Sequence, residues 1–269
     1  MSDRPLTLMT VQAHPDDEVT STGGALAKYA AEGITTIVVT CTDGRCGDGP
    51  NGVKPGQPGH DPEAVVATRR RELEASCAAL KVSHLEMLGY HDSGMMGWDT
   101  NSAPGSFWST PVDVAARKLA ALIEKYRPDV LVTYDENGGY GHPDHIQVHR
   151  VTMAAVELAA VPKLYMSVFP ESSMTKVGER MRELGIGLDE LNSEEAQPEG
   201  WPDEKITAWV DVASVIDQKF DALSAHASQG DGAFFIGLGR ETFGAVMGVE
   251  AYVGVGFSGA ETDLFEGLR

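Results

Sequence analysis

Two short segments carry most of the side chains that could do chemistry. The first is HPDDE at residues 14–18, and the second is HPDH at residues 142–145. Imidazole and carboxylate groups are ordinary zinc ligands, and a catalytic zinc takes three of them and keeps one position for water. Charged groups at this density are costly to bury unless a cation compensates them. Together the two segments predict a catalytic metal site.

The choice of ligands follows partly from spacing. His14 and Asp17 are three positions apart and can converge on one point if a helix begins just after His14. A third ligand must come from another loop, where the candidates are His142, Asp144, His145 and His149. Each segment alone is also typical of a helix start, with proline at the first helical position and aspartate in the first turn. Both segments together favour the metal site, whereas His149 is better explained as part of a solvated helix face.

The surrounding pattern predicts the elements that must position these segments. Apolar runs predict strands at 6–13, 35–42, 84–89 and 129–135, and helical spacing predicts helices at 22–33, 64–80 and 112–126. This alternation predicts an α/β fold with a Rossmann-like, doubly wound, mostly parallel sheet and helices on both faces. Such sheets bind ligands at the C-terminal ends of their strands. The active site is therefore expected among the loops at 14–18, 43–62 and 135–145, of which the glycine- and proline-rich 43–62 suggests a lid or substrate wall.

The second half of the chain has a looser pattern. Strands are expected at 163–169 and 206–212, with a polar stretch at 170–205 and a helix at 214–226. No repeat or clear boundary divides the chain. We expect a single domain over 1–269, in which 1–160 forms the core with the metal site and 161–269 completes the sheet and the substrate pocket.

Composition restricts the partners. The net charge of −19, from 21 Lys and Arg against 40 Asp and Glu, opposes nucleic-acid binding, which relies on clustered basic residues. No apolar run approaches the roughly 18 to 20 residues that span a bilayer, so a cytoplasmic protein without membrane contact is expected. Cys41, Cys46 and Cys77 show no C-x-x-C spacing, which argues against a disulfide framework and a thiolate zinc site. The sequence does not determine the oligomeric state, and a homo-oligomer is one of the states compatible with it.

The paired motifs resemble a known enzyme family. AHPDDE at 13–18 with GGYGHPDH at 138–145 is similar to the LmbE-like (PIG-L) zinc-dependent N-deacetylases, and among them to the deacetylases and S-conjugate amidases of mycothiol metabolism. Shorter similarities extend over most of the chain, namely VVTCT, RRREL, DSGM, KLY, AHASQ and ETDL. The resemblance implies hydrolysis of the amide of a small N-acyl amino sugar conjugate, such as an N-acetylglucosaminyl compound, with Zn²⁺ as cofactor. Two histidines and a carboxylate would also suit Fe²⁺.

By this resemblance, the metal ligands are His14, Asp17 and His145. Asp16 is left beside the metal as the general base, which would take a proton from water that the metal activates. Glu18 would either complement the N-terminus of the following helix or contact the substrate.

Three further residues are implied in catalysis. Tyr140, in the flexible GGYG turn, would donate to the oxyanion. His142, oriented by Asp144, would supply positive charge or a proton to the departing amine. The alternatives are an ordinary loop aromatic at Tyr140 and a first-turn helix carboxylate at Asp144.

The sugar pocket of the relatives corresponds here to Arg69, Asp92 and Met95. Arg69 could equally belong to the solvated charged face of RRRE. The loop DGRCGDG at 43–49 departs from the family pattern, because Arg45 and Cys46 stand where glutamates are usual. Since the arginine fork favours carboxylate or phosphate, we expect a substrate with a negative group near Arg45. Cys46 is expected to be an inert, buried side chain.

Two other classes of protein fit less well. A metal-free sugar-binding module on the same fold would have little reason to keep His14, Asp16, Asp17 and His145 together. A nucleotide-binding protein of Rossmann type would carry a glycine-rich fingerprint after its first strand, where this chain has HPDDE instead.

Overall fold

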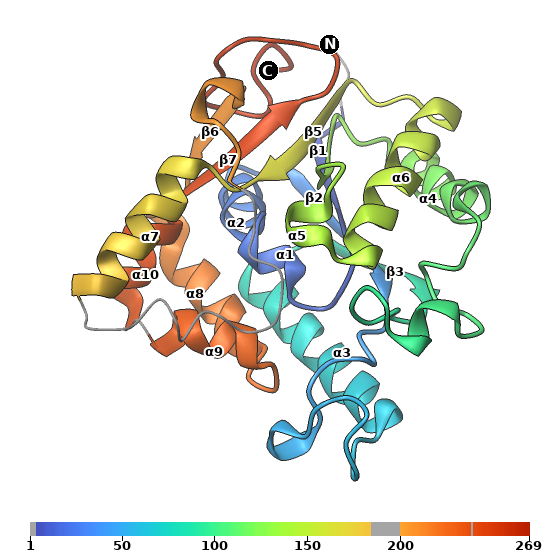
Figure 1. The fold of residues 1–269 in the computed structure, drawn as a ribbon. Helices are drawn as coiled ribbons and strands as arrows, with labels where there is room; N and C mark the ends of the chain where they lie inside the picture. The colour runs from blue at the N-terminus through green and yellow to red at the C-terminus, as the bar shows by residue number, and fades with distance from the viewer. Residues whose placement is uncertain (1–3, 184–199, 238) are drawn as a thin grey trace.

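The computed structural model describes residues 4–183, 200–237 and 239–269. Within them, seven strands form one sheet in the order β3-β2-β1-β4-β5-β7-β6 (Figure 1). The strands are β1 Thr7–Gln12, β2 Thr35–Thr42, β3 His84–Tyr90, β4 Val130–Tyr134, β5 Lys163–Val168, β6 Ala208–Asp211 and β7 Val249–Gly254. β1 to β5 are parallel, and β7 runs antiparallel to both β5 and β6. The predicted mostly parallel α/β sheet is therefore confirmed.

Helices connect and cover the strands. The α-helices of the described residues are α1 Asp17–Thr20, α2 Gly23–Ala31, α3 Pro62–Ala79, α4 Val112–Tyr126, α5 Gly138–Gly141, α6 Pro143–Leu158, α7 Glu171–Glu183, α8 Ile216–Ala225, α9 Gly230–Gly237 and α10 Gly239–Met247. α3 shows why a helix starts where it does: the Asp61 carboxylate accepts from the backbone N–H groups of Glu63 and Ala64, and Pro62 takes the first helical position.

The two largest apolar clusters of the core lie one on each face of the sheet, and a smaller one lies around Met166, Val168 and Ile206. α2, α3 and α8 cover one face and α4 and α6 the other (Figure 1). Side chains of β1 alternate between the two largest clusters, since Leu8 packs in the first and Met9 and Val11 pack in the second. All three are fully buried, and burial of such a side chain contributes roughly 1.5–3 kcal/mol. The β1 strand is thus held firmly from both sides.

The sheet order brings the two chemistry-bearing segments together. β1 and β4 are neighbouring parallel strands, with Leu8 opposite Val130 and Thr10 opposite Val132. Both strands end at the same edge of the sheet, so the loops at 14–18 and 135–145 leave from adjacent positions.

The second half of the chain differs more from its prediction. The sequence pattern does not predict α7, α9, α10 or β7. α7 lies inside the polar stretch at 170–205, of which residues 184–199 are outside the described residues. β7 is a short strand followed closely by glycines, a pattern that is weak on its own, and it inserts between β5 and β6.

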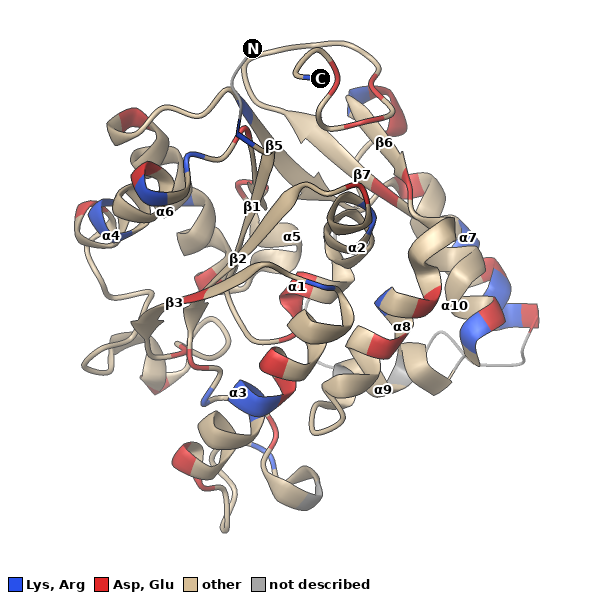
Figure 2. Cartoon of the chain, turned by 180° about the vertical axis from the view of Figure 1, so that it is seen from behind, with Lys and Arg blue, Asp and Glu red and all other residues tan. Residues whose placement is uncertain are grey.

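Acidic and basic residues occur side by side on several helices, including α3 and α7, as the view from behind shows (Figure 2). In the part of the chain that the structure describes, no helix is long and apolar enough to cross a membrane.

Candidate active site

Three side chains each place one donor atom around a common point. Nδ1 of His14 lies 3.2 Å from Oδ2 of Asp17 and 3.3 Å from Nε2 of His145. The remaining edge, from Asp17 Oδ2 to His145 Nε2, is 3.4 Å. Ligands about 2.0–2.1 Å from a tetrahedral metal lie about 3.3–3.4 Å apart, so the triangle has the size of one face of such a site. We call these residues the metal triad.

The second nitrogen of each histidine ring has its own acceptor. His14 Nε2 lies 3.2 Å from Oδ2 of Asp144, and His145 Nδ1 lies 3.1 Å from the carbonyl oxygen of Gly138. A ring that donates from one nitrogen presents a lone pair at the other, and such supporting bonds are usual behind metal ligands. Both rings are therefore held in the tautomer that a metal requires.

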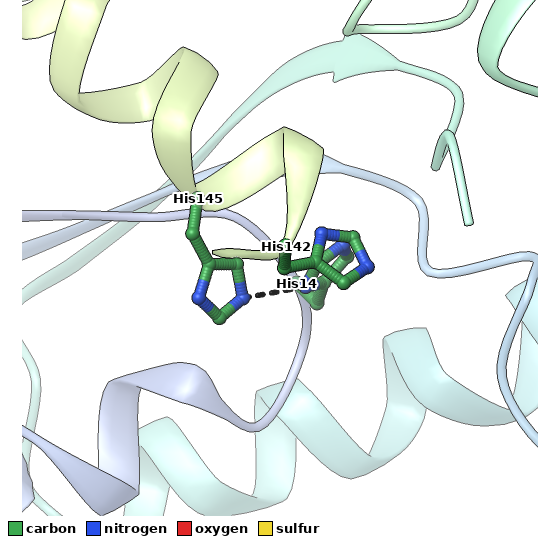
Figure 3. Close-up of side chains that lie close together, drawn as sticks. All are labelled: His14, His142 and His145. Atoms are coloured by element: carbon green, nitrogen blue, oxygen red, sulfur yellow. Dashed lines mark hydrogen bonds between the residues drawn. The ribbon is translucent and has the colours of Figure 1, made fainter. Parts of the chain in front are cut away.

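Two other groupings overlap with the triad. His14 lies near His142 and His145, and also near Asp92 and Asp144, with all ligand atoms of a group within 4.8 Å of one another. Figure 3 shows the three histidine rings gathered together, with His145 bonded to His14. However, Nδ1 of His142 accepts from the backbone N–H of Asp144. The Asp144 carboxylate in turn accepts from His14 Nε2, so each alternative grouping contains a residue that already supports a neighbour.

The negative charge around His14 also favours a cation at this position. Burial alone would lower the pKa of His14, but the carboxylates of Asp92, Asp144 and Asp17 outweigh burial and raise it well above 6.5. So much negative charge around a buried ring favours a positive charge at that place. A cation held by the triad would supply that charge.

Asp16 lies beside the triad and belongs to a different network. Its backbone has φ 124°, a strained value for a residue other than glycine. Its Oδ2 accepts from Arg69 at 2.8 Å, and its N–H donates to Glu18 at 2.9 Å. Burial raises the pKa of Asp16 to about 6, with Arg69 opposing this rise. A carboxylate with such a pKa, adjacent to a metal site, suits a general base at neutral pH.

Glu18 lies in the first turn of α1 and complements its N-terminus, one of the two roles expected for it, because its carboxylate accepts from the N–H of Asp16 at the N-cap. It is fully buried, and its carboxylate accepts from the Asp16 N–H, from Ser76 and from His226, which lies 2.7 Å away. His226 follows the last residue of helix α8 and lies 208 positions after Glu18 in the chain. It was not assigned a role from sequence, although the AHASQ similarity contains it.

The rest of AHASQ ties the loop at 43–62 to the core. Ser228 donates to Glu72 from its N–H and its hydroxyl. Gln229 accepts from the N–H of Asp48 at 3.1 Å and donates to its carbonyl oxygen. Through these hydrogen bonds the AHASQ motif connects the C-terminal half of the chain to α3 and to the loop at 43–62.

The expected pairing of the Asp144 carboxylate with His142 is wrong. The carboxylate of Asp144 does not orient His142, because it accepts from His14 Nε2 and from the Ser93 N–H. Burial, followed by the neighbouring His14 and His145, lowers the pKa of His142 well below 6.5, which favours the proton-donating alternative over a positive charge. Its Nδ1 accepts from a backbone N–H, so its proton sits on Nε2 and His142 is a neutral donor.

Two tyrosines flank His145. Tyr140 is half-buried, with its ring centroid 5.1 Å from that of His145, in a turn where Gly138 has φ 64° and a Cβ would meet His145 Cβ at 2.5 Å. Tyr134, which sequence reasoning missed, stacks on His145 at 4.4 Å. Its hydroxyl also accepts from the Ala13 N–H and hydrogen-bonds Asp17. Tyr134 is the last residue of β4, at the end of the strand that leads to the HPDH segment, and this position in the sequence could have identified it as a site residue.

The three residues expected to bind substrate, Arg69, Asp92 and Met95, differ in burial and in their contacts. Arg69 is buried and bonds Asp16, Pro15 and Gly44, so a solvated face is wrong for it. Asp92 borders His14 and accepts from the N–H groups of Cys46 and Gly94. Met95 is half-buried in the turn that follows.

The loop at 43–49 gives Arg45 partners within the chain. Arg45 pairs with Asp43 at 3.0 Å and with the largely exposed Glu63 at 3.3 Å. Burial raises the pKa of Cys46 to about 12, which makes its thiol a poor nucleophile. His149, expected on a solvated face, is half-buried and bonds the carbonyl oxygen of Tyr134.

Known proteins resemble this chain in sequence and in fold. The model of the family described as PIG-L: GlcNAc-PI de-N-acetylase matches residues 9–156, a range that contains the whole metal triad. The 1D-myo-inositol 2-acetamido-2-deoxy-alpha-D-glucopyranoside deacetylase of Acidothermus cellulolyticus is 41% identical over 97% of this chain and 94% of its own length.

Solved structures show the same fold at low identity. The N,N'-diacetylchitobiose deacetylase of Pyrococcus horikoshii has a TM-score of 0.58 at 20% identity and covers 93% of this chain and 83% of its own. The 4-carboxy-2-hydroxymuconate hydratase of Pseudomonas putida has a TM-score of 0.60 at 19% identity and covers 93% of this chain and 96% of its own. Since one fold carries a deacetylase and a hydratase, function must be argued from the site.

Proposed function

This chain belongs to the GlcNAc-PI de-N-acetylase (PIG-L) family, and we propose that it is a metal-dependent hydrolase that removes the acetyl group from an N-acetylglucosaminyl conjugate. The observation that carries the proposal is the pairing of a complete metal triad with Asp16, a carboxylate that lies beside the triad and outside it. A binding module would need neither the strained backbone nor the raised pKa of Asp16.

We infer that the triad holds Zn²⁺, with Fe²⁺ as the second candidate, because two histidines and one carboxylate suit both. When bound, such a cation polarises a carbonyl group and lowers the pKa of water toward neutrality. His14, Asp17 and His145 hold it, and Asp144, Gly138 and Tyr134 keep these ligands in place.

Asp16 moves the proton. Its pKa of about 6 leaves it deprotonated at neutral pH, and Arg69 engages Oδ2, which leaves Oδ1 to accept the proton of the attacking water. The water oxygen bonds to the amide carbon and the C–N bond then breaks. Asp16 passes the same proton to the nitrogen, so the products are acetate and a free amine. His142, as a neutral donor, and the Tyr140 hydroxyl stabilise the negative charge on the amide oxygen.

We also propose that residues 1–269 form one catalytic domain that works in the cytoplasm. Support for one domain comes from a buried cluster that joins Leu8 and Val38 to Phe220 and Tyr252. Support for the compartment comes from the three cysteines, none of which is paired.

The test is release of primary amine from two purified substrates, an N-acetylglucosaminyl-inositol conjugate and a larger glucosaminyl amide of the S-conjugate type. We expect turnover of the first and its loss in Asp16→Asn. Faster turnover of the larger amide would assign the amidase type of reaction instead. Tight binding of the first without amine release, by the metal-loaded protein, would make the chain a non-catalytic sugar-binding module.

A further inference from the structure

The turn that carries Tyr140 is held at its base by the carboxylate of Asp135. Asp135 directly follows β4 and is only 3% exposed. Its Oδ1 accepts from the backbone N–H groups of Asn137 at 3.0 Å and of Gly139 at 2.9 Å. Its Oδ2 accepts from the indole Nε1–H of Trp201 at 2.7 Å. We call these three bonds the Asp135 network.

The turn has little packing on its Gly139 side. Gly138 and Gly139 have φ 64° and 77°, values that glycine adopts without strain. Within the described residues, a Cβ added at Gly139 would meet no atom within 4 Å beyond its chain neighbours. An open pocket of about 240 Å³ borders Asp135, Gly139 and Trp201. Because the turn faces free space here, its conformation depends on the hydrogen bonds of the Asp135 network.

The same turn supplies a supporting bond of the metal triad. The carbonyl oxygen of Gly138 lies 3.1 Å from Nδ1 of His145, and this bond leaves Nε2 of the ring for a metal. Gly138 lies between the two residues whose N–H groups bond the Asp135 carboxylate, and its own N–H donates to the Asp135 carbonyl oxygen at 3.0 Å. Movement of the turn would therefore displace the acceptor that orients His145.

Backbone pairing places Trp201 beside Asp135. β4 and β5 are parallel neighbours, so Asp135 leaves the sheet next to the end of β5. Just beyond that end, the Trp201 N–H donates to the carbonyl oxygen of Phe169 at 2.8 Å, and the Trp201 carbonyl oxygen accepts from the Glu171 N–H at 2.9 Å. The indole therefore starts from a fixed backbone position.

Apolar packing holds the indole in the same place. Trp201 lies against a cluster that comprises Met166, Val168, Ile206 and Ala251. Tryptophan combines such packing with one N–H that normally finds an acceptor. A carboxylate is a strong acceptor, so the bond to Asp135 is stronger than one between two neutral groups.

We propose that Trp201 is a positioning residue of the metal site, which acts through the Asp135 network on the turn at 137–141 and so on His145 and Tyr140. The inference rests on the proposed function, because His145 must be a metal ligand. It gives the second half of the chain a part in the metal site, through a residue 66 positions after Asp135.

Trp201→Phe is the variant that tests the bond, because it removes the indole N–H and keeps an aromatic ring in the cluster. In the metal-free variant, the amides of Asn137 and Gly139 should exchange with solvent about tenfold faster than in the wild type, while those of β1 keep their rate. The affinity for Zn²⁺, measured by competition with a chelator, should fall by about tenfold, the lower end of the effect of losing a supporting bond.

Trp209→Phe is the matched control, because Trp209 lies on β6, packs against the same cluster and stands outside the Asp135 network. It should leave both the exchange of the turn and the affinity for Zn²⁺ at their wild-type values. If Trp201→Phe behaved like Trp209→Phe in both measurements, the inference would be overturned.

A double-mutant cycle separates the hydrogen bond from packing. Asp135→Asn keeps the two N–H acceptor bonds of the turn on its oxygen and presents an NH₂ group to the indole, so the bond to Trp201 is lost. In this background Trp201→Phe should lower the affinity for Zn²⁺ no further. An equal further loss in both backgrounds would show that Trp201 acts through packing alone and would contradict the proposal.

Kinetics complete the test. At saturating Zn²⁺, kcat of Trp201→Phe should fall by about tenfold with KM within about twofold, since a displaced Tyr140 affects the reaction step more than binding. Exchange and affinity for Zn²⁺ need no turnover, whereas amine release by the wild type tests the proposed function. An inactive wild type whose turn still loosens and whose Zn²⁺ affinity still falls in Trp201→Phe would refute the proposed function and leave the positioning role intact.

Discussion

Asp144 lies 3.2 Å from Nε2 of His14 through its Oδ2, although the two residues are 130 positions apart in the chain. The same carboxylate accepts from the Ser93 N–H at 2.9 Å and is fully buried. It therefore turns Nδ1 of His14 toward Asp17 and His145 and supports the metal triad from behind.

Asp144→Asn is accordingly expected to weaken metal binding. Loss of such a supporting carboxylate typically costs about 10–100-fold in metal affinity. Competition with a chelator measures this, and His142→Gln serves as the control that should leave the affinity within a few-fold. If Asp144→Asn kept full metal affinity and lost only kcat, Asp144 would act through His142, as the sequence suggested.

Tyr140→Phe and Tyr134→Phe form a pair with different expected outcomes. The ring of Tyr140 lies edge-on to that of His145 with the centroids 5.1 Å apart, so loss of its hydroxyl should lower kcat by about 10²–10³ with KM and metal content little changed. Tyr134 bonds Asp17 and the Ala13 N–H, so its variant should weaken metal binding instead. Steady-state kinetics and metal analysis on both variants separate these effects. Identical behaviour of the two variants would contradict the roles assigned here.

The Glu18–His226 pair should make stability depend on pH. Burial opposes both charges, yet their mutual attraction raises the pKa of His226 above 6.5 and lowers that of Glu18 below 4.5. The raised histidine stabilises the fold fully below 6.5 and loses this effect as pH rises through its folded-state pKa. The lowered glutamate contributes fully above 4.5 and loses this effect in acid.

The pair therefore contributes most between pH 4.5 and 6.5. We expect the Tm difference between the wild type and His226→Gln to be larger at about pH 6 than at about pH 9. Thermal unfolding followed by circular dichroism measures both. A difference that stayed constant or grew toward pH 9 would mean that the pair is not charged in the folded protein.

A second buried ion pair lies away from the site. Lys219 Nζ is 2.7 Å from Glu250 Oε1, with side chains only 1% and 4% exposed, and Glu250 also accepts from the N–H groups of Gly24 and Ala25 at the start of α2. Lys219→Met leaves the carboxylate buried without its cation and should cost about 3–5 kcal/mol of unfolding free energy. Urea unfolding measures this loss.

Lys219→Met/Glu250→Gln is the matched control, because it removes both charges and should recover part of the stability. A loss below about 1 kcal/mol in the single variant would show that Glu250 finds other compensation.

The sequence predicts the place of the site better than its internal bonds. Apolar periodicity is enough to find β1 and β4, and parallel pairing then brings HPDDE and HPDH to one edge of the sheet. Which nitrogen of His14 faces Asp144 depends on side-chain packing, which periodicity does not encode. The partner of Glu18 is equally hidden, because His226 comes from 208 positions away.

Arg45 shows the same limit. Its residue type correctly suggests an affinity for carboxylates, but only the fold shows that Asp43 and Glu63 already supply them. Local sequence therefore indicates what a side chain can bind, and tertiary structure decides whether it is still available.

The most direct test of the account is elemental analysis combined with amine release from an N-acetylglucosaminyl conjugate, on the wild type, Asp16→Asn and His145→Ala. We predict about one metal ion per chain in the wild type and in Asp16→Asn, and its loss in His145→Ala. Asp16→Asn should be slower by about 10²–10⁴-fold despite its metal. A metal-loaded Asp16→Asn that kept its activity, or a His145→Ala that kept its metal, would contradict the division of the site into a metal triad and a separate base.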